Sequence, residues 1–111
     1  MKYLMLVCMD ESVNLSGAER ANMTAEVEAW VSGMDDSGVR LLGNQLAPTS
    51  DATTVRVRDG EVLLGDGPFA ETKEQIAGFD LIDCADLDQA IDVASKHPVA
   101  RFGALQVRPY I

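Results

Sequence analysis

The apolar positions of this chain follow two different periods, which together predict a mixture of strands and helices. Residues 3–9 are apolar at every position and are followed by charged residues, which predicts a short strand buried on both faces. From residue 23 to residue 34 the apolar side chains recur every three or four positions, which predicts one apolar stripe along a helix. Ser16 and Glu19 have the spacing of a capping box at its start, and Gly38 supplies a C-terminal stop. The stripe consists of Met23, Val27, Trp30, Val31 and Met34.

The rest of the chain continues this alternation of strand and helix patterns. After the first helix we expect a strand over 39–46, a loop over 47–51 and a hairpin, followed by at most a turn or two of helix over 71–76 and a strand over 78–84. A second helix is expected after Asp86 and should end at Pro98, with Leu87, Ala90, Ile91 and Ala94 on one face. The last expected element is a strand over 104–108.

The hairpin is the clearest local signal. Asp59 and Gly60 separate two runs of alternating residues, and Asp-Gly is a preferred pair for a two-residue turn. That turn sets the register of the two strands, because opposed residues lie at equal distances from it. One face then carries Val55, Val57, Val62 and Leu64, and the other carries Arg56, Arg58, Glu61 and Leu63. The same register places Asp66 on the apolar face, opposite Thr53.

The order of the elements predicts one α+β domain over residues 1–111. It is expected to be ferredoxin-like, with an antiparallel sheet of five or six strands and two helices on one face. Residues 3–9 are apolar on both faces of the sheet, yet two helices cover only one of them. A second copy of the sheet is the simplest cover for the other face, so we expect a homodimer.

Composition narrows the classes of partner. Hydrophobic residues make up 47% of the 111 residues, which suits a single globular domain. Nine Lys and Arg against 18 Asp and Glu give a net charge of −9, which argues against nucleic acid and anionic membranes as partners. The apolar run at the start is too short for a signal peptide or a membrane span, so we expect a cytoplasmic protein. Cys8 and Cys84 have no metal-ligand spacing and are expected to be reduced core thiols, with no metal or cofactor.

One motif resembles a known family. The run Asp66-Gly-Pro-Phe-Ala-Glu-Thr-Lys-Glu-Gln75, followed by Gly78-Phe79, resembles the signature of the DGPF group of YCII-related proteins. The likeness extends to residues 1–7, 53–60 and 107–109. The resemblance implies a dimeric α+β barrel, in which two ferredoxin-like subunits pack sheet against sheet. Its motif residues here are Gly67, Pro68, Phe69, Glu71 and Lys73.

The resemblance also leaves two main functions open. YCII relatives are similar in fold to muconolactone isomerases and are thought to use a His–Asp pair as acid and base, while DGPF members often accompany alternative sigma factors. Residues 11–20, which lead into the first helix, contain no His, so only the Asp66 half of that pair carries over. The chain is therefore expected to bind an unknown small molecule, either as a cofactor-free acid/base enzyme of isomerase or lyase type or as a ligand-sensing module without catalysis. A purely structural dimer is a third interpretation.

Asp66, the candidate catalytic residue, has two interpretations of its own. In the first, its carboxylate accepts backbone N–H groups, because Asp-Gly-Pro is typical of a turn. In the second, the hairpin register directs it to the apolar side, where the loss of water contacts would suit it to acid/base chemistry.

Polar residues within the strands are candidates for substrate binding. Asp80, Gln106 and Arg108 each lie between apolar neighbours, and in a sheet covered on both faces such residues line a cavity or its rim. An Arg beside a carboxylate suits an anionic group of a ligand, but Asp80 and Arg108 could equally form an edge ion pair. Tyr3 could donate to a ligand or could simply pack.

Two further groups have simpler explanations. Glu71 and Lys73 do not share a helical face and are expected to brace their loop, through Asp66 or the neighbouring strand. His97, the only histidine, ends the second predicted helix and is expected to interact favourably with the C-terminus of that helix.

Overall fold

The computed structural model describes residues 1–111. In chain order the elements are β1 (Lys2–Met9), α1 (Gly17–Asp36), β2 (Arg40–Gln45), the short 3₁₀ turn η1 (Thr49–Asp51), β3 (Thr53–Arg58), β4 (Glu61–Asp66), β5 (Gln75–Asp83), α2 (Leu87–Ser95), the 3₁₀ turn η2 (Pro98–Arg101) and β6 (Ala104–Pro109).

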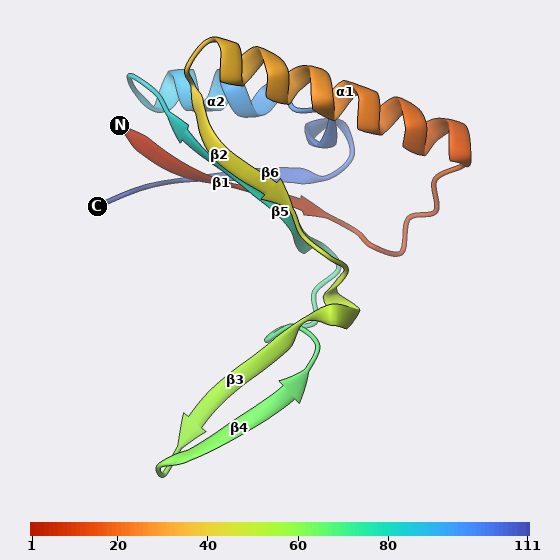
Figure 1. The fold of residues 1–111 in the computed structure, drawn as a ribbon, viewed down its shortest axis with the longest axis vertical. Coiled ribbons are helices and arrows are strands. Elements are labelled where there is room, and N and C mark those ends of the chain that lie inside the picture. Colours follow the sequence, from red (N-terminus) through yellow and green to blue (C-terminus); the bar gives the residue numbers. More distant parts are fainter.

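The main sheet is antiparallel and has the strand order β2-β5-β1-β6. Both helices lie on the same face of it, as Figure 1 shows. This is the ferredoxin-like α+β arrangement that the order of elements predicts. The expected number of strands is wrong, however, because the sheet has four: β3 and β4 pair only with each other and form a separate two-stranded sheet.

Helix α1 begins and ends where the sequence predicts. The Ser16 side chain accepts from the Glu19 backbone N–H, and the Glu19 carboxylate accepts from the Ser16 N–H, so both halves of the capping box are present. Gly38 follows the helix with a positive φ of 77°, the left-handed conformation that favours glycine. Trp30 is the buried residue of the predicted stripe, and the other four members are half-buried beside it.

Helix α2 is capped by Asp86 as predicted, but it is rotated away from the predicted face. Leu87 and Ile91 are exposed, and the buried residues are Ala90, Val93 and Ala94. The indole N–H of Trp30 donates to the Val93 carbonyl at 3.1 Å, and this tertiary contact turns the Val93 side of α2 towards α1. The helix ends at Ser95, so Pro98 begins the following 3₁₀ turn instead of closing α2.

Strand β5 begins earlier than the local pattern predicts. Gln75 and Ile76, expected in a short helical turn, pair with Met9 and Cys8 of β1. The ladder to a strand more than 60 residues away in the sequence therefore overrides a weak local helical preference.

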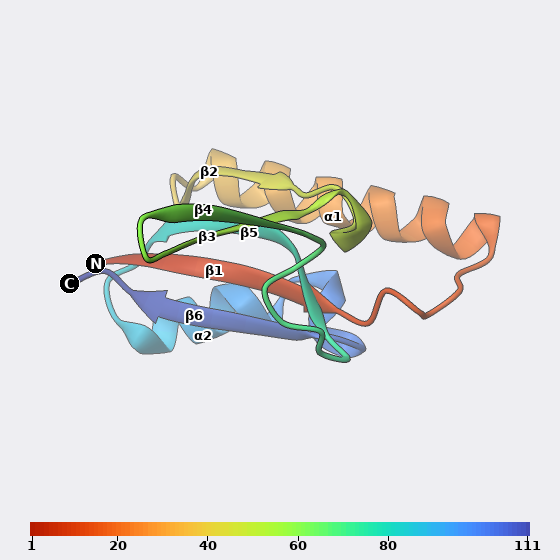
Figure 2. The same ribbon diagram turned by 90° about the horizontal axis from the view of Figure 1, so that it is seen from below.

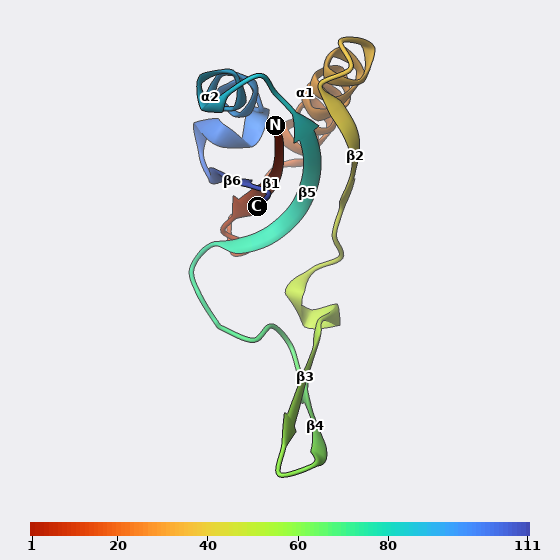
Figure 3. The same cartoon turned by 90° about the vertical axis from the view of Figure 1, so that its left-hand side faces the viewer.

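The two faces of β1 have different surroundings. Tyr3, Met5 and Val7 are buried beneath the helices, whereas Leu4 and Leu6 point to the opposite face and are only half-buried. Figure 3 shows that neither helix covers that second face. We call it the uncovered face; from the strand pairing it carries Leu4, Leu6, Leu42, Ile76, Phe79, Leu81, Gln106 and Arg108.

The thiols of Cys8 and Cys84 are both free, and burial raises the pKa of each above its usual value. Cys84 is buried and Cys8 is half-buried. No helix of the structure combines the length and the apolar character needed to cross a membrane.

The hairpin has the predicted register. Val57 pairs with Val62 and Thr53 pairs with Asp66, and the turn residues Asp59 and Gly60 have φ angles of 51° and 77°. Two successive positive φ angles are those of a type I′ turn. The hairpin projects from the body on the side opposite the helices (Figures 1 and 2). We call residues 53–66 the arm.

Candidate functional site

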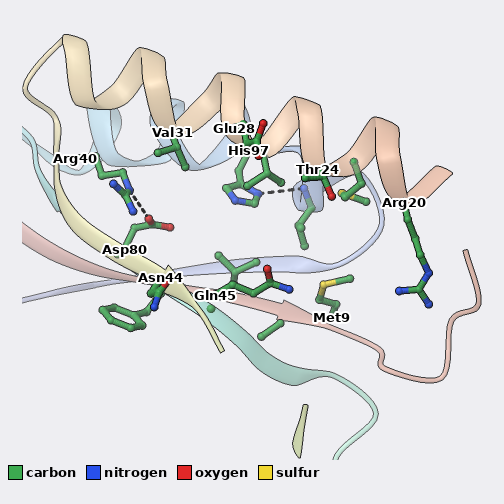
Figure 4. A pocket seen from close by; sticks show the side chains of 18 of the residues that line it. Met9, Arg20, Thr24, Glu28, Val31, Arg40, Asn44, Gln45, Asp80 and His97 are labelled. Atoms are coloured by element: carbon green, nitrogen blue, oxygen red, sulfur yellow. Dashed lines mark hydrogen bonds and ion pairs between the residues drawn. The ribbon is translucent and has the colours of Figure 1, made fainter. Parts of the chain in front are cut away.

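A cleft of about 530 Å³ lies between α1 and the helix-covered face of the sheet (Figure 4). Side chains of α1 form one wall, and β1, β2, β5 and the segment around η2 contribute the rest. Its volume falls within the range of about 300–1,000 Å³ that is usual for small-molecule sites. About half of the lining residues are apolar, and the polar ones include Arg20, Glu28, Gln45, Asp80 and His97.

Asp80 and Arg40 form the strongest polar contact of the cleft. The Arg40 Nε donates to Asp80 Oδ1 at 2.7 Å, and its Nη1 donates to Asp35 Oδ1 at 3.0 Å. Asp80 is only 6% exposed, and this burial raises the pKa of its carboxyl in spite of the Arg40 charge. Burial alone would lower the pKa of Arg40, but the two carboxylates outweigh it and raise that pKa.

The second carboxylate oxygen of Asp80 remains available. Oδ2 makes no hydrogen bond within the chain, yet every fully buried side-chain nitrogen or oxygen has a partner. Oδ2 is therefore accessible, and Asp80 is one of the residues that line the cleft. The arrangement leaves one anionic oxygen for a ligand while the other is held by Arg40.

Gly43 makes room for this ion pair. It lies opposite Asp80 in the pairing of β2 with β5. A Cβ atom at position 43 would collide with Asp80 Oδ1 and would lie 2.6 Å from the Phe79 carbonyl oxygen. The close approach of β2 to the Asp80 carboxylate therefore requires glycine at this position.

His97 supplies a second polar group to the cleft. Its Nδ1 accepts from the Val99 backbone N–H at 3.1 Å, and its ring meets Trp30 edge-on with the centroids 4.8 Å apart. Burial lowers the pKa of His97 to about 4, so the ring is neutral near neutral pH. Because Nδ1 is the acceptor, the proton lies on Nε2, which has no partner within the chain. His97 thus offers a hydrogen-bond donor in the cleft.

The expectation that His97 acts as a cation at a helix C-terminus is wrong. The residue is buried and neutral, and it caps η2 through Nδ1 instead. A favourable interaction with a helix dipole needs a charged imidazole, and desolvation prevents that charge from forming.

Asp80 lies in the cleft, but the predicted edge ion pair between Asp80 and Arg108 is wrong. In the sheet, Asp80 pairs with Met5 and Arg108 pairs with Leu4. Neighbouring residues of β1 point to opposite faces, so Asp80 faces the helices and Arg108 lies on the uncovered face. Two residues predicted to act together are therefore separated by the sheet itself.

The other two candidates for substrate binding also lie outside the cleft. Gln106 is on the uncovered face, where its side-chain amide lies beside the Arg108 guanidinium. Tyr3 is fully buried in the core, with its hydroxyl 3.8 Å from the Met1 sulfur. Of the four predicted substrate-binding residues, only Asp80 lines the cleft.

Asp66 also lies away from the cleft. It is exposed at the end of β4, and its carboxylate accepts no hydrogen bond from any other group of the chain. The turn that follows is held by backbone groups: the Gly67 N–H donates to the Ala52 carbonyl at 2.8 Å, and Thr54 Oγ1 donates to the Gly67 carbonyl at 2.8 Å. These bonds close the base of the arm, and the catalytic role of Asp66 stays a hypothesis.

The remaining motif residues line a smaller polar cleft of about 410 Å³ or lie beside it. Pro68, Glu71 and Lys73 belong to its lining, while Phe69 is exposed. Glu71 and Lys73 make no hydrogen bond or ion pair in the chain, so the expected bracing through Asp66 or a strand is wrong. The loop is held instead by the Gln75 amide, whose Nε2 donates to the Ala70 and Thr72 carbonyls at 3.1 and 3.2 Å.

Acidic groups dominate the other side of this polar cleft. Ser12 donates to Asp10 through its hydroxyl and its N–H, which lowers the pKa of Asp10, and the Lys73 charge adds to the effect. Glu11 accepts from the Thr49 backbone N–H and hydroxyl and so ties two loops together. No group of three or more His, Cys, Asp or Glu side chains is placed to hold a metal ion.

The whole chain matches one known protein family. Residues 1–111 match the YCII-related domain. The chain belongs to the YCII-related family. An uncharacterized protein of Rhizobium meliloti (strain 1021) is 52% identical over 67 residues, which cover 59% of this chain and 54% of that protein. The chain therefore spans about half the length of this curated relative.

A solved structure has the same fold. It is 5-chloro-2-hydroxyhydroquinone dehydrochlorinase (TftG) from Burkholderia phenoliruptrix AC1100, in complex with 2,5-dihydroxybenzoquinone. The match has a TM-score of 0.58 and covers 100% of this chain and 94% of that chain, at 14% sequence identity. At that identity the likeness establishes the fold and not the activity.

Three residues of the cleft were not found from the sequence: Arg40, Gly43 and His97. The available signal was the glycine within a predicted strand, which indicates a close approach of another group. Arg40 and His97 carried no such signal, because the Asp80 carboxylate lies 40 positions from Arg40 and the burial of His97 depends on distant residues such as Trp30.

Proposed function

We propose that the cleft between α1 and the sheet binds a small organic molecule, and that the protein acts on it by cofactor-free acid/base chemistry. The observation that carries this proposal is that one partly apolar cleft contains two polar atoms of opposite hydrogen-bonding character, neither of which has a partner within the chain. One is the anionic Oδ2 of Asp80, and the other is the neutral Nε2–H of His97. An anionic acceptor and a neutral donor suit a substrate that loses a proton at one atom while charge develops on an oxygen.

In this proposal Asp80 is the general base. Its burial favours the protonated form, so its carboxylate is a stronger base than an ordinary Asp, while Arg40 limits this effect and fixes its orientation. His97 donates from Nε2 to the substrate oxygen on which negative charge develops. Return of the proton from Asp80 to a different substrate atom completes an isomerisation, and departure of a leaving group instead completes an elimination.

The choice of a probe follows from the cleft and from its structural neighbour. The apolar part of the lining favours a molecule with a hydrocarbon or ring body, and its polar side chains, Asp80 and His97 among them, favour oxygen substituents. TftG was solved with 2,5-dihydroxybenzoquinone, a ring of this description. This compound is therefore a reasonable first probe, followed by phenols and lactones of similar size.

The binding test uses the only histidine as an internal reporter. Titration of the protein with 2,5-dihydroxybenzoquinone should shift the single set of imidazole NMR signals. With a phenol as the probe, Asp80→Asn and His97→Asn should each weaken binding by about tenfold or more, because the phenol O–H donates to Asp80 Oδ2 and the phenol oxygen accepts from His97 Nε2. Asparagine at 97 can still accept from the Val99 N–H, so that variant should fold. Asp36→Asn, an exposed carboxylate outside the cleft, should bind as the parent does.

Binding that is unchanged by both cleft substitutions, or signal shifts confined to the uncovered face, would contradict the proposal. The positioning of Asp80 has a test of its own. Gly43→Ala should weaken binding of the same probe and lower stability by about 1–3 kcal/mol, because the new methyl displaces the ion pair. Gly33→Ala, at a helical site with open space around it, should keep binding and raise stability by up to about 1 kcal/mol.

The alternative function is ligand sensing without catalysis, as in a regulatory module associated with a sigma factor. Two observations favour it: Arg40 already engages one Asp80 oxygen, and Asp66 lies outside the cleft. Once binding is established, a test for chemical conversion of the bound probe distinguishes the two functions. Recovery of each bound probe unchanged, with the parent protein at high concentration, would favour sensing, whereas product formation that Asp80→Asn abolishes would favour catalysis.

We also propose that the protein is a homodimer in which the uncovered faces pack together. Leu42 and Ile76 on that face are 52% and 40% exposed, and apolar groups left this open favour association. Light scattering should give about twice 12.0 kDa. A 12 kDa species at micromolar concentration would contradict the dimer. A catalytic role for Asp66 depends on this dimer, because a partner is needed to bury it.

A further inference from the structure

The arm carries a row of apolar side chains that nothing in the chain covers. Val55, Val57, Val62 and Leu64 lie on one of its faces and are 57–71% exposed. The chain joins the arm to the body only at its base, through the bonds at Gly67. A two-stranded hairpin with no further support is marginally stable in water, so this row is a candidate contact surface.

The position of the arm indicates what lies beside it. In Figure 1 the helices are above the sheet and the arm extends below it, and the view from below in Figure 2 places the arm in front of the uncovered face. Anything seated on the uncovered face is therefore flanked by the arm.

The uncovered face itself has a centre and a rim. Leu4, Leu6 and Leu81, on the inner strands β1 and β5, are half-buried, whereas Leu42 on the edge strand β2 and Ile76 at the start of β5 are exposed. A second sheet packed on the centre of this face would leave the apolar side chains of its rim exposed to solvent. The arm is the part of this chain that extends far enough from the sheet to supply it.

We propose that the apolar row of the arm packs on the rim of the uncovered face of a second copy of this chain. The proposal rests on the sheet-to-sheet dimer proposed above and adds a second contact to it. A two-fold arrangement makes the contact reciprocal, so two arms cover two rims and the assembly closes without further copies. The row carries no charge, and the chain has a net charge of −9, so nucleic acid and anionic membranes are poor alternatives.

The first test compares two adjacent cross-strand pairs that lie on opposite faces of the arm. Val57→Gln with Val62→Gln removes the middle of the apolar row, while Arg56→Gln with Leu63→Gln changes the adjacent pair on the other face. Sedimentation should show that the first variant raises the dimer dissociation constant by at least about tenfold, because two buried valines are lost per arm. The second variant should stay close to the parent. Equal dissociation constants for the two variants would overturn the proposal.

The second test does not depend on how either variant folds. In the parent protein, isotope-filtered NOE spectra of a mixture of labelled and unlabelled copies detect only contacts between copies. The expected result is contact between the methyl groups of the arm and Leu42 or Ile76 of the partner subunit. A dimer whose arm gives contacts only within its own chain, or only with the other arm, would overturn the proposal but leave the sheet-to-sheet dimer intact. A monomer would overturn both, and neither result bears on ligand binding in the cleft.

Discussion

Strand β1 and the arm are both built from apolar residues in extended conformation, but their surroundings differ. The side chains of Tyr3 and Met5 in β1 are fully buried under two helices and between two neighbouring strands. The valines of the arm have one neighbouring strand and no covering layer. The local sequence pattern thus produces strands both in β1 and in the arm, but only the tertiary structure decides whether a strand stabilises the fold.

This difference assigns separate roles to the two regions. A fully buried large apolar side chain contributes about 1.5–3 kcal/mol to folding, so the body holds most of the stability of the chain. The arm contributes little while it remains exposed, and its apolar row becomes favourable only when another surface covers it. The contrast can be tested by substitutions that should act on one region and not on the other.

The largest expected effect comes from truncating one apolar side chain in each region. Met5→Ala should lower the free energy of unfolding by about 2–5 kcal/mol, because it opens a cavity in the core. Val62→Ala, in the arm, should change the unfolding of dilute protein by less than about 0.5 kcal/mol. Urea denaturation at several protein concentrations checks both values. An equal loss for the two variants in dilute solution would show that the arm is part of the cooperative core.

The next effect concerns the buried imidazole in the body. A pKa lowered from 6.5 to about 4 means that unfolded His97 gains a proton below pH 6.5 while the folded form does not. The stability due to this residue is therefore complete above pH 6.5 and should fall by about 3 kcal/mol as the pH drops to 4. The measurement is urea denaturation across this range for the parent and for His97→Asn.

Carboxylates titrate in both the parent and His97→Asn, so only the difference between the stability–pH profiles of these two proteins reports on His97. A difference that stays constant from pH 7 to pH 4 would show that the imidazole is accessible to protons in the folded state. The same titration can be followed directly, because the chain contains a single histidine.

The smallest effect is expected at the junction of the arm with the body. Asp66 is exposed in the single chain, so Asp66→Asn should change the stability of dilute protein by less than about 0.5 kcal/mol. A loss near 1 kcal/mol would instead support the interpretation that its carboxylate accepts hydrogen bonds in the turn. A gain seen only at concentrations where the protein is dimeric would show that the second copy buries this carboxyl.

Much of the local structure could be predicted from the sequence, since it depends on neighbours along the chain. The capping box of Ser16 with Glu19 and the register around Asp59-Gly60 are set by residues a few positions apart. The rotation of α2 was not predictable in this way, because the contact of Trp30 with Val93 joins residues 63 positions apart.

The same distinction separates what sequence and tertiary structure determined about the site. By itself, the sequence determined the ferredoxin-like order of elements, the family resemblance and the alternation that places Asp80 and Arg108 between apolar neighbours. Only the tertiary structure decided which face each of them occupies, that Arg40 is the partner of Asp80, and that His97 is neutral. The physical reason is that ion pairing and desolvation depend on distances through space, and these are fixed only when the sheet and helices have packed together.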